Sequence, residues 1–424
     1  MYLSARQALR YALVAALGLH SVPGAAVPID DAADLLTARA SSVETTIAKN
    51  GEGDFKNYRI VALANAGNNV ILASYDGRPD GGDSPSPNSI MQRRSTDGGK
   101  TWGEPTYIAK GQTSGTKYGF SDPSYVVDRD NNKIFNFHTF SKDVGFGNSK
   151  IGNDDADRNI MSAHISVSTD GGQSWSTDPK NRPNLPPNAE DLITKIVKPV
   201  GSTQNGKENV GGVVGTFATS GEGIQLRYGA HKGRLIQQYV GRVIQDDGSE
   251  ARQAYSVYSD DGGSTWKMGT PVGSGMDENK VVELSNGDVM LNSRPQSAGY
   301  RKVAKSTDGG VTYSEPKDET QLPDPANNGH ITRMYPDAAE GSAEAKILLF
   351  TNTNSKTSRV DGTVRYSCDD GVKWSAGKKF HSGKTEYSLI TALGDDTWGI
   401  FYEVLESGQL NFAKVDKEYL GVSC

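Results

Sequence analysis

The chain has 424 residues, of which 49 are glycine and 35% are hydrophobic, and its formal net charge at pH 7 is −6. This composition is typical of many short strands joined by turns, and it argues against a helical bundle or a membrane protein. The mild acidity and the absence of a basic run exclude nucleic acid as an expected partner.

The first 26 residues have the features of an export signal. Arg6 and Arg10 form a positively charged segment, residues 11–19 are apolar, and residues 24–26 are small enough for cleavage. The alternative is a short N-terminal helix. No apolar run reaches the length of a membrane span. We therefore expect a secreted, extracellular protein with a signal peptide at 1–26 and no membrane anchor.

Residues 27–50 are expected to form an N-terminal leader, either with a short helix or mobile, ahead of a folded domain at 51–424. Strand-like runs then alternate with Gly, Asp and Asn turns as far as Glu403. One interruption, at about 176–207, is rich in Pro, Asn and Lys, and it includes a possible helical turn at 189–198. We interpret it as an insertion between repeats.

An eight-residue motif, Ser-x-Asp-x-Gly-x-x-aromatic, recurs five times and includes four of the five tryptophans. The copies begin at Ser95, Ser168, Ser259, Ser306 and Ser367. Repeats about 45 to 90 residues apart indicate one supersecondary unit used again and again, and this spacing equals one to two blades of a β-propeller.

The octad has the chemistry of a turn between two antiparallel strands. Its Asp can bond nearby backbone N–H groups, its Gly adopts positive φ at little cost, and its aromatic residue can begin the next strand and pack inward. The repeated carboxylates are therefore predicted to stabilise turns on the outer rim, away from any pocket. They are Asp97, Asp170, Asp261, Asp308 and Asp369.

Two cysteines occur, Cys368 in the fifth octad and Cys424 at the C-terminus. In an oxidising compartment an even pair favours one structural disulfide, and the alternative is two free thiols. The six histidines show no metal-ligand spacing, so we expect neither a metal nor another cofactor.

Several short polar segments lie between the octads, and each taken alone is an ordinary solvated loop. They are residues 57–60, 74–83, 275–279, 291–294, 356–359 and 384–388. Together and in this order, the segments and octads resemble the secreted microbial exo-sialidase (neuraminidase) family with Asp boxes. The similarity runs from about Tyr58 to the C-terminus. Asp boxes also occur in other glycosidases and in non-catalytic propellers, so the ordered segments carry the specificity.

The resemblance implies an all-β, six-bladed β-propeller of four-stranded antiparallel blades. It also implies that three arginines, Arg59, Arg294 and Arg359, bind the carboxylate of the substrate, because fixed guanidinium groups form charge-assisted bonds at any working pH. Val61 stands where the family has Pro after its Arg-Ile pair. Arg78 is similar to the neighbouring arginine that meets the ring substituents of the sugar.

The catalytic residues are likewise implied by resemblance. Asp83 matches the acid/base on a mobile loop, in preference to Asp76 and Asp80 in the same segment. Tyr387 matches the nucleophile and Glu278 the carboxylate that takes its proton; sialidases use Tyr in place of a second carboxylate. The anomeric carbon of sialic acid carries a carboxylate, which repels an anionic nucleophile but does not repel a neutral phenol.

Two further acidic residues have roles by resemblance. Glu403 is similar to the carboxylate that orients an active-site arginine, expected to be Arg59, and Asp122 lies where the family places a polar residue facing the substrate.

The expected activity is retaining hydrolysis of terminal α-linked sialic acids on glycoconjugates by a monomer, through a tyrosyl-enzyme intermediate. Two enzyme alternatives stay open: a preference for deaminated sialic acid (KDN), and transfer of sialic acid to another sugar. A non-catalytic Asp-box propeller that binds glycans is the third alternative. It predicts loss of Tyr387, Glu278 or Asp83, and all three residues are present.

Overall fold

Alternating apolar and polar residues, interrupted by Gly, Asn and Asp, direct most of this chain into antiparallel strands. The computed structural model describes residues 43–177, 191–200, 203–204, 207–208 and 212–424. Within these ranges the helical elements are single turns: α2 (Thr194–Val197), α3 (Lys417–Leu420), and 3-10 turns at Gly229–His231 and Glu344–Lys346. The predicted all-β class is confirmed.

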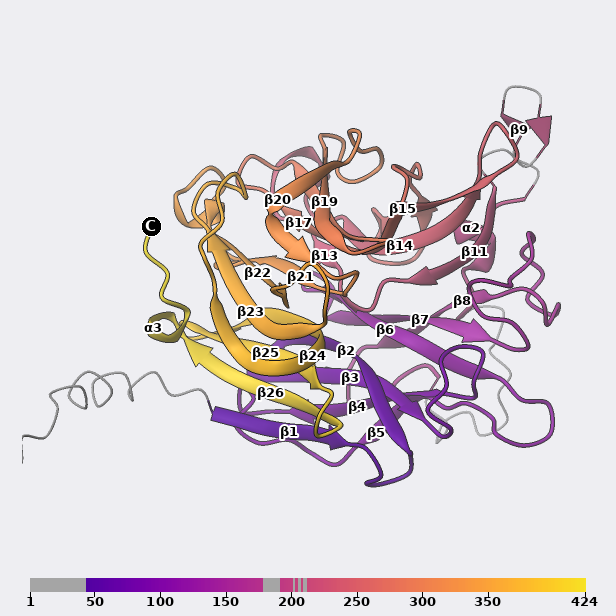
Figure 1. Ribbon diagram of the computed structural model, residues 1–424, viewed down its shortest axis with the longest axis horizontal. Helices are drawn as coiled ribbons and strands as arrows, with labels where there is room; N and C mark the ends of the chain where they lie inside the picture. The colour runs from indigo at the N-terminus through magenta and orange to yellow at the C-terminus, as the bar shows by residue number, and fades with distance from the viewer. Residues whose placement is uncertain (1–42, 178–190, 201–202, 205–206, 209–211) are drawn as a thin grey trace, which may run out of the picture. The chain divides into compact units, whose positions relative to one another are not determined.

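Four sheets of four or five strands each make up most of the fold (Figure 1). The first has the order β2 (Asn57–Gly67), β3 (Val70–Arg78), β4 (Ser89–Ser95), β5 (Thr106–Ala109). The second has the order β12 (Gly221–Glu222), β6 (Gly119–Asp128), β7 (Lys133–Ser141), β8 (Ser162–Ser168).

The third sheet has the order β11 (Val213–Ala218), β14 (Leu235–Ile244), β15 (Glu250–Ser259), β16 (Lys267–Met268), with β13 (Ile224–Gln225) also on β14. The fourth has the order β17 (Met276–Glu283), β18 (Val289–Pro295), β19 (Gly299–Ser306), β20 (Lys317–Asp324). A short ribbon, β9 (Thr203–Gln204) with β10 (Lys207–Glu208), lies in the insertion.

The last sheet has seven strands because one long strand belongs to two groups. Its order is β1 (Val43–Lys49), β26 (Gln409–Asp416), β25 (Thr397–Val404), β24 (Lys378–Gly394), β23 (Val360–Ser367), β22 (Leu348–Thr353), β21 (His330–Arg333). The first part of β24, Lys378 to Lys384, pairs with β23, and the part from Thr385 onward pairs with β25. A bend in one strand thus joins two four-stranded groups.

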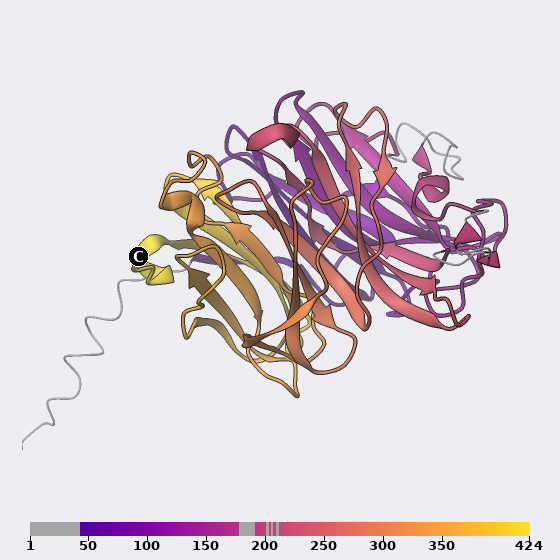
Figure 2. The ribbon, with the colours of Figure 1, turned by 90° about the horizontal axis from the view of Figure 1, so that it is seen from above.

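The sheets are arranged in a circle. Strand β2 contacts β6 and β24, β14 contacts both β6 and β17, and β21 contacts both β17 and β24. Figures 1 and 2 show the yellow C-terminal strands next to the indigo strands from the start of the domain. This is the arrangement of a β-propeller, as the octad repeats predict.

Strand β1 corrects the expected domain boundary. The sequence analysis places residues 43–49 in the leader, but in the structure they pair antiparallel with β26, for example Thr45 with Phe412. The reason is that exposed Glu44 and Thr46 alternate with less exposed Thr45 and Ile47, and Ile47 is 1% exposed. The folded domain therefore begins before residue 51. The predicted signal peptide and the rest of the leader lie outside the described residues.

Four of the five octads connect the last two strands of their groups, β4 to β5, β15 to β16, β19 to β20 and β23 to β24, as expected for a turn between antiparallel strands. The second octad follows β8, the last strand of its sheet. In the first copy, the Ser95 hydroxyl donates to Asp97 (2.8 Å), and the Gly99 amide donates to Ser95 (2.9 Å). The Thr101 amide and hydroxyl donate to the Asp97 carboxylate at 2.9 and 2.6 Å. These bonds from Thr101 hold the pKa of Asp97 at about 2. Both oxygens of the Asp97 carboxylate thus accept hydrogen bonds within its own turn.

The octads also fasten neighbouring sheets together. A Cβ added to Gly99 would lie 2.8 Å from the Phe412 ring on β26, and one on Gly371 would lie 2.9 Å from Met290 on β18. The octad aromatic packs at the same boundary: the ring centres of Trp102 and Phe412 are 5.0 Å apart. In the four octads that connect two strands, the aromatic residue precedes the following strand by up to four residues and does not begin it, because its ring packs between the sheets.

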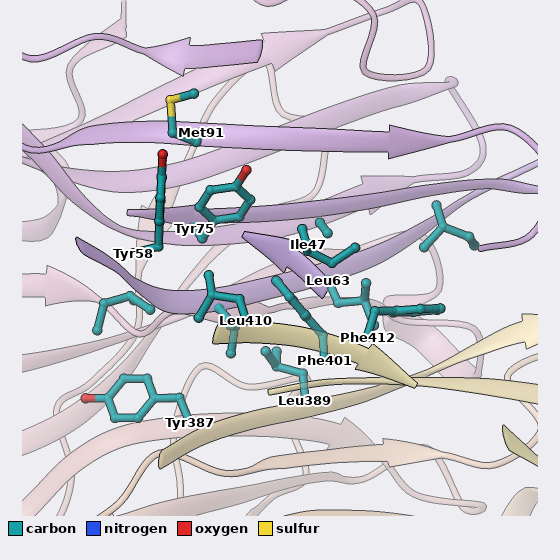
Figure 3. Packing of buried hydrophobic residues seen from close by; sticks show 14 of the residues in the cluster. Ile47, Tyr58, Leu63, Tyr75, Met91, Tyr387, Leu389, Phe401, Leu410 and Phe412 are labelled. Atoms are coloured by element: carbon teal, nitrogen blue, oxygen red, sulfur yellow. The ribbon is translucent and has the colours of Figure 1, made fainter. Parts of the chain in front are cut away.

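The hydrophobic core is divided into clusters between adjacent sheets. One cluster joins strands β1 to β4 with β24 to β26 and includes Tyr387 and Leu389. Figure 3 shows Tyr387 at the margin of this cluster, with its hydroxyl directed away from Leu389 and Phe401. The core therefore holds the Tyr387 ring while its hydroxyl is free to face other groups.

Cys368 and Cys424 form the predicted disulfide, with their Cα atoms 5.7 Å apart. The predicted helical turn of the insertion is present as α2, while residues 178–190 lie outside the described part. Among the residues that the structure describes, no helix is both long enough and apolar enough to cross a bilayer.

Candidate active site

Four of the predicted site residues lie at or near the ends of their strands, and a fifth lies where its strand changes partner. Arg59 is near the start of β2, Glu278 is near the start of β17, and Tyr387 is just after the point where β24 changes partner. Arg78 and Arg294 are at the ends of β3 and β18, which pair antiparallel with β2 and β17. The start of one strand and the end of its antiparallel neighbour share an edge, so these five residues are brought together.

Tyr387, Glu278 and Arg294 form a buried hydrogen-bonded group. The Tyr387 hydroxyl donates to Glu278 Oε2 at 2.9 Å, and Arg294 Nη1 donates to the same hydroxyl at 3.2 Å. Arg294 also forms an ion pair with Glu278 and lies 3.3 Å from Asp277 Oδ2. The exposed fractions of Tyr387 and Glu278 are 8% and 1%, so the pair is nearly removed from solvent.

Burial controls the protonation of this pair. It raises the pKa of Tyr387 well above its usual range, and the Glu278 carboxylate raises it further while Arg294 lowers it. Burial also raises the pKa of Glu278, against the lowering effect of Arg294. The phenol is thus neutral at working pH, and the carboxylate beside it has an increased affinity for a proton.

The other two predicted arginines also lie close to the Tyr387 ring. The guanidinium carbon of Arg59 is 5.9 Å from the ring centre and that of Arg359 is 5.8 Å from it. Together with Arg294, they place three positive charges around one phenol. The side chains of Arg59 and Arg359 are 28% and 31% exposed, so both can contact a ligand.

Glu386 is a carboxylate of this group that the sequence analysis missed. It forms ion pairs with both Arg59 and Arg359, the latter at 3.2 Å. It directly precedes Tyr387, and its side chain is 11% exposed. Because one carboxylate is bonded to two guanidinium groups, it fixes the separation of the arginines that it joins.

Glu403 holds Arg59, as expected for an orienting carboxylate. Arg59 Nε donates to Glu403 Oε2 at 2.9 Å, and the backbone amide of Ile60 donates to Oε1 at 2.6 Å. Ile60 has φ of 61°, a strained value for a β-branched residue, and it belongs to the bulge between Arg59 and Ala62. The carboxylate thus supports both a side chain and an unusual backbone conformation.

Arg78 lies among three aspartates. It donates to Asp76 Oδ2 from Nη2 at 2.9 Å and from Nε at 3.2 Å, and Nη2 reaches Asp83 Oδ1 at 3.1 Å. Asp76 also accepts from the Asp122 amide at 3.1 Å. Burial raises the pKa of Asp76 to about 7 despite Arg78, and burial followed by Asp76 raises the pKa of Asp122.

Asp83 is exposed, unlike Asp76. Its side chain is 78% exposed, while that of Asp76 is fully buried. Asp80, the other acidic residue in the segment, bonds the Gly82 amide and the Ser86 hydroxyl in its own loop. Asp76 therefore supports Arg78, while Asp83 is both exposed and bonded to Arg78.

The arrangement combines an activated phenol, a cluster of guanidinium groups and an exposed carboxyl group. A neutral phenol with a carboxylate at hydrogen-bond distance can act as a nucleophile with its own base. The arginines favour an anionic ligand beside that phenol. An exposed carboxyl group near Arg78 can exchange protons with a leaving group or with water.

The supporting acids Glu386, Asp277 and Asp76 were not predicted to take part. Their positions in the sequence could have indicated them, because each of these acids lies within two residues of a predicted site residue. Several arginines that converge on one pocket also need negative charges beside them. Asp277 illustrates this, since it pairs with Arg252 at 2.6 Å as well as with Arg294.

Comparisons with known proteins place the chain in a family. Residues 71–402 match the family described as BNR repeat-like domain. A sialidase of Micromonospora viridifaciens is 47% identical over 427 residues, covering 99% of this chain and 61% of the relative. A sialidase of Bacteroides fragilis is 26% identical over 368 residues, covering 83% of this chain and 61% of the relative.

Among solved structures, the Hadza microbial sialidase Hz136 is similar with a TM-score of 0.74 at 25% identity, covering 89% of this chain and 69% of that chain. The chain thus spans about three fifths of the length of the two curated relatives, at 61% of each.

Proposed function

The chain belongs to the sialidase family with BNR repeats, and we propose that it is a retaining exo-sialidase. It removes terminal α-linked sialic acids from glycoconjugates through a covalent tyrosyl intermediate, without a cofactor. The observation that carries this proposal is the hydrogen bond of 2.9 Å from the Tyr387 hydroxyl to Glu278, inside a group of three arginines.

The arginines explain the substrate class. A sialic acid carries its carboxylate on the anomeric carbon, so the anion and the reacting atom enter the site together. Arg59, Arg294 and Arg359 surround Tyr387 and bind that carboxylate through charge-assisted bonds. The nucleophile is a neutral phenol, which the substrate carboxylate does not repel.

The reaction has two displacement steps. In the first, Tyr387 Oη attacks the anomeric carbon while its proton passes to Glu278, and Asp83 protonates the departing glycosidic oxygen. In the second, Asp83 takes a proton from water, the water oxygen attacks the anomeric carbon, and Tyr387 leaves and recovers its proton from Glu278. Two inversions give net retention.

Asp83 suits both of its roles because its position is exposed. The aglycone leaves toward solvent and the attacking water enters from it. Asp83 Oδ1 is 3.1 Å from Arg78 Nη2, which keeps it beside the proposed sugar site. Arg78 and Asp122 are proposed to contact ring substituents of the sugar, and Glu403 to orient Arg59.

The seven-stranded sheet counts as two blades, because β24 pairs with β23 in its first part and with β25 in its second. With the four smaller sheets this gives a six-bladed propeller. The disulfide suits an oxidising compartment, and we propose that the protein is secreted and acts as a monomer.

The test is turnover of a fluorogenic aryl sialoside by the wild-type protein and by Tyr387→Phe. The expected result is turnover by the wild type and a fall of about 10³-fold or more in kcat for the variant, because the phenyl ring cannot attack. Tyr107→Phe is the matched control, since the Tyr107 hydroxyl also donates to a carboxylate, Asp54, at 2.8 Å but on the outer strand β5.

A trapping experiment identifies the nucleophile directly. A 2,3-difluoro sialic acid has a good leaving group at C2, while the fluorine at C3 slows hydrolysis, so the glycosyl-enzyme accumulates. Mass spectrometry of the digested protein should place the sugar on Tyr387. Label on any other residue contradicts the mechanism. Comparing kcat/KM on matched aryl glycosides of N-acetylneuraminic acid and KDN then assigns the C5 preference.

A further inference from the structure

Lys280 on β17 is a buried lysine with an unusual environment. It is 1% exposed, and its Nζ donates to Asn328 Oδ1 at 3.0 Å and to the Asn279 carbonyl at 3.4 Å. Both acceptors are neutral, and the described residues place no carboxylate in an ion pair with it. Lysine is almost never fully buried without a charged partner, because an ammonium loses its hydration there. Packing alone therefore does not account for a lysine at position 280.

Lys280 lies on the same strand as the proposed base Glu278, close enough for the two charges to act on each other. It follows Glu278 by two residues on β17, as Leu389 follows Tyr387 by two residues on β24. Lys280 and Leu389 meet over Gly221: a Cβ there would lie 2.7 Å from Lys280 Cε and 2.6 Å from Leu389 Cδ2. The absence of a side chain at Gly221 leaves the space that the lysine fills.

The charged groups facing Lys280 come from several strands. Glu278 favours its charged form, whereas Arg294 on β18 and Arg301 on β19 oppose it. Burial lowers the pKa of His330, at the start of β21, and the charge of Lys280 lowers it further. Burial lowers the pKa of Lys280 to about 7. The interaction is mutual, since Lys280 lowers the pKa of Glu278.

We propose that Lys280 is a positioning residue whose ammonium, acting through its field, keeps Glu278 deprotonated and ready to receive the proton of Tyr387. The inference rests on the proposed function, and Lys280 itself does not touch the substrate. Its effect is largest below pH 7, where the lysine is charged.

A purely structural role makes the opposite prediction for stability. If Lys280 served packing and hydrogen bonding alone, its replacement would destabilise the fold and leave the pH dependence of catalysis unchanged. If it is retained for its field, removing an unpaired buried charge stabilises the protein while it impairs the reaction.

The experiment compares Lys280→Met with the wild type by melting temperature and by the pH profile of kcat/KM on an aryl sialoside. A unit charge about 7 Å away, two residues along a strand, moves the protonation of its neighbour by about one pH unit or more. The acid limb of kcat/KM should therefore move up by about one pH unit, which is about a tenfold loss below that limb, while the melting temperature rises.

Lys198→Met is the matched control. Lys198 is also 1% exposed, and its Nζ donates to Ser149 and to the Lys150 carbonyl. Burial likewise lowers its pKa, to about 8, but the charges that act on it are Lys142, Arg242, Asp155 and Asp157, none of which belongs to the site. Its replacement should leave the acid limb in place.

An acid limb that moves by less than about 0.3 pH units in Lys280→Met overturns the proposal and leaves the proposed function intact. Lys280→Gln is the second variant, since it is neutral and can still bond Asn328, and it should show the same shift. If neither variant folds, Lys280 is structural and the proposal is wrong. Absence of turnover in the wild type overturns the proposed function and this inference with it.

Discussion

The substitution Glu403→Gln tests whether the site depends on one buried carboxylate. Glu403 is 2% exposed, and its two oxygens accept from Arg59 Nε at 2.9 Å and from the Ile60 amide at 2.6 Å. Glutamine has the same shape but one oxygen. Its NH₂ group therefore faces one of these two donors, and one buried donor loses its acceptor.

The magnitude follows from these two contacts. An unsatisfied buried donor costs about 1–3 kcal/mol, and breaking a buried ion pair costs about 3–5 kcal/mol when no other partner remains. Arg59 keeps Glu386 as a second partner, so we expect a loss of about 3 kcal/mol in the free energy of unfolding. Loosening one arginine of the proposed clamp should remove about 2 kcal/mol of transition-state binding, a fall of about 30-fold in kcat/KM.

Urea unfolding and kcat/KM on an aryl sialoside measure the two effects separately. Glu406→Gln is the control, because Glu406 is an exposed carboxylate that accepts from the Lys384 amide outside the site. It should leave kcat/KM within about twofold of the wild type. If Glu403→Gln lowers stability but keeps wild-type kcat/KM, Glu403 supports the fold and does not orient Arg59 for the reaction.

Three further measurements address stability. Gly99→Ala should lower the free energy of unfolding by about 2–4 kcal/mol, because its Cβ would lie 2.8 Å from an aromatic ring of the adjacent sheet. The control Gly248→Ala, at φ of 81° with open space around it, should lower it by about 1 kcal/mol. Equal losses would refute the role of the octad in joining neighbouring sheets. Replacing Cys368 and Cys424 by Ala should cost about 4 kcal/mol, from their separation of 56 residues, with unchanged kcat/KM. The folded-state pKa of Lys280, about 7, is below the unfolded value of about 10.4, so the unfolded state binds more protons between these pH values and stability rises with pH across that window. Urea unfolding at pH 6 and pH 9 should show a smaller rise for Lys280→Met than for the wild type, and an equal rise would show that Lys280 does not titrate in this range.

The local chemistry of the repeats was predictable from sequence, and long-range partnerships were not. The octad specifies its own turn, because Ser95, Asp97 and Thr101 satisfy one another within eight residues. The contacts of Glu386 with Arg59 span 327 residues, and no local pattern indicates such a pairing. The sequence did not predict strand β1 for the same reason: its alternation is visible, but its partner β26 lies at the other end of the chain.

The candidate site residues were found through family resemblance, and the structure adds the electrostatic support around them. An Asp beside an Arg, as in 76–78, is common on any surface, so its meaning depends on burial. Asp76 is fully buried and bonded to Arg78 through two nitrogens, which no composition or spacing could establish. Burial is a property of the assembled sheets, and it separates Asp76 from the exposed Asp83.

The pairing of β1 with β26, and of Arg59 with Glu403, has a consequence for biosynthesis. Residues 59 and 403 are 344 positions apart, and a ribosome adds about 5–20 residues per second. Arg59 therefore emerges about 20–70 seconds before the carboxylate that holds it. Until the final blade has been translated and has docked, neither the arginine nor the first strand has its partner. A nascent chain that has not reached residue 403 should therefore lack the carboxylate that holds Arg59 in the candidate site.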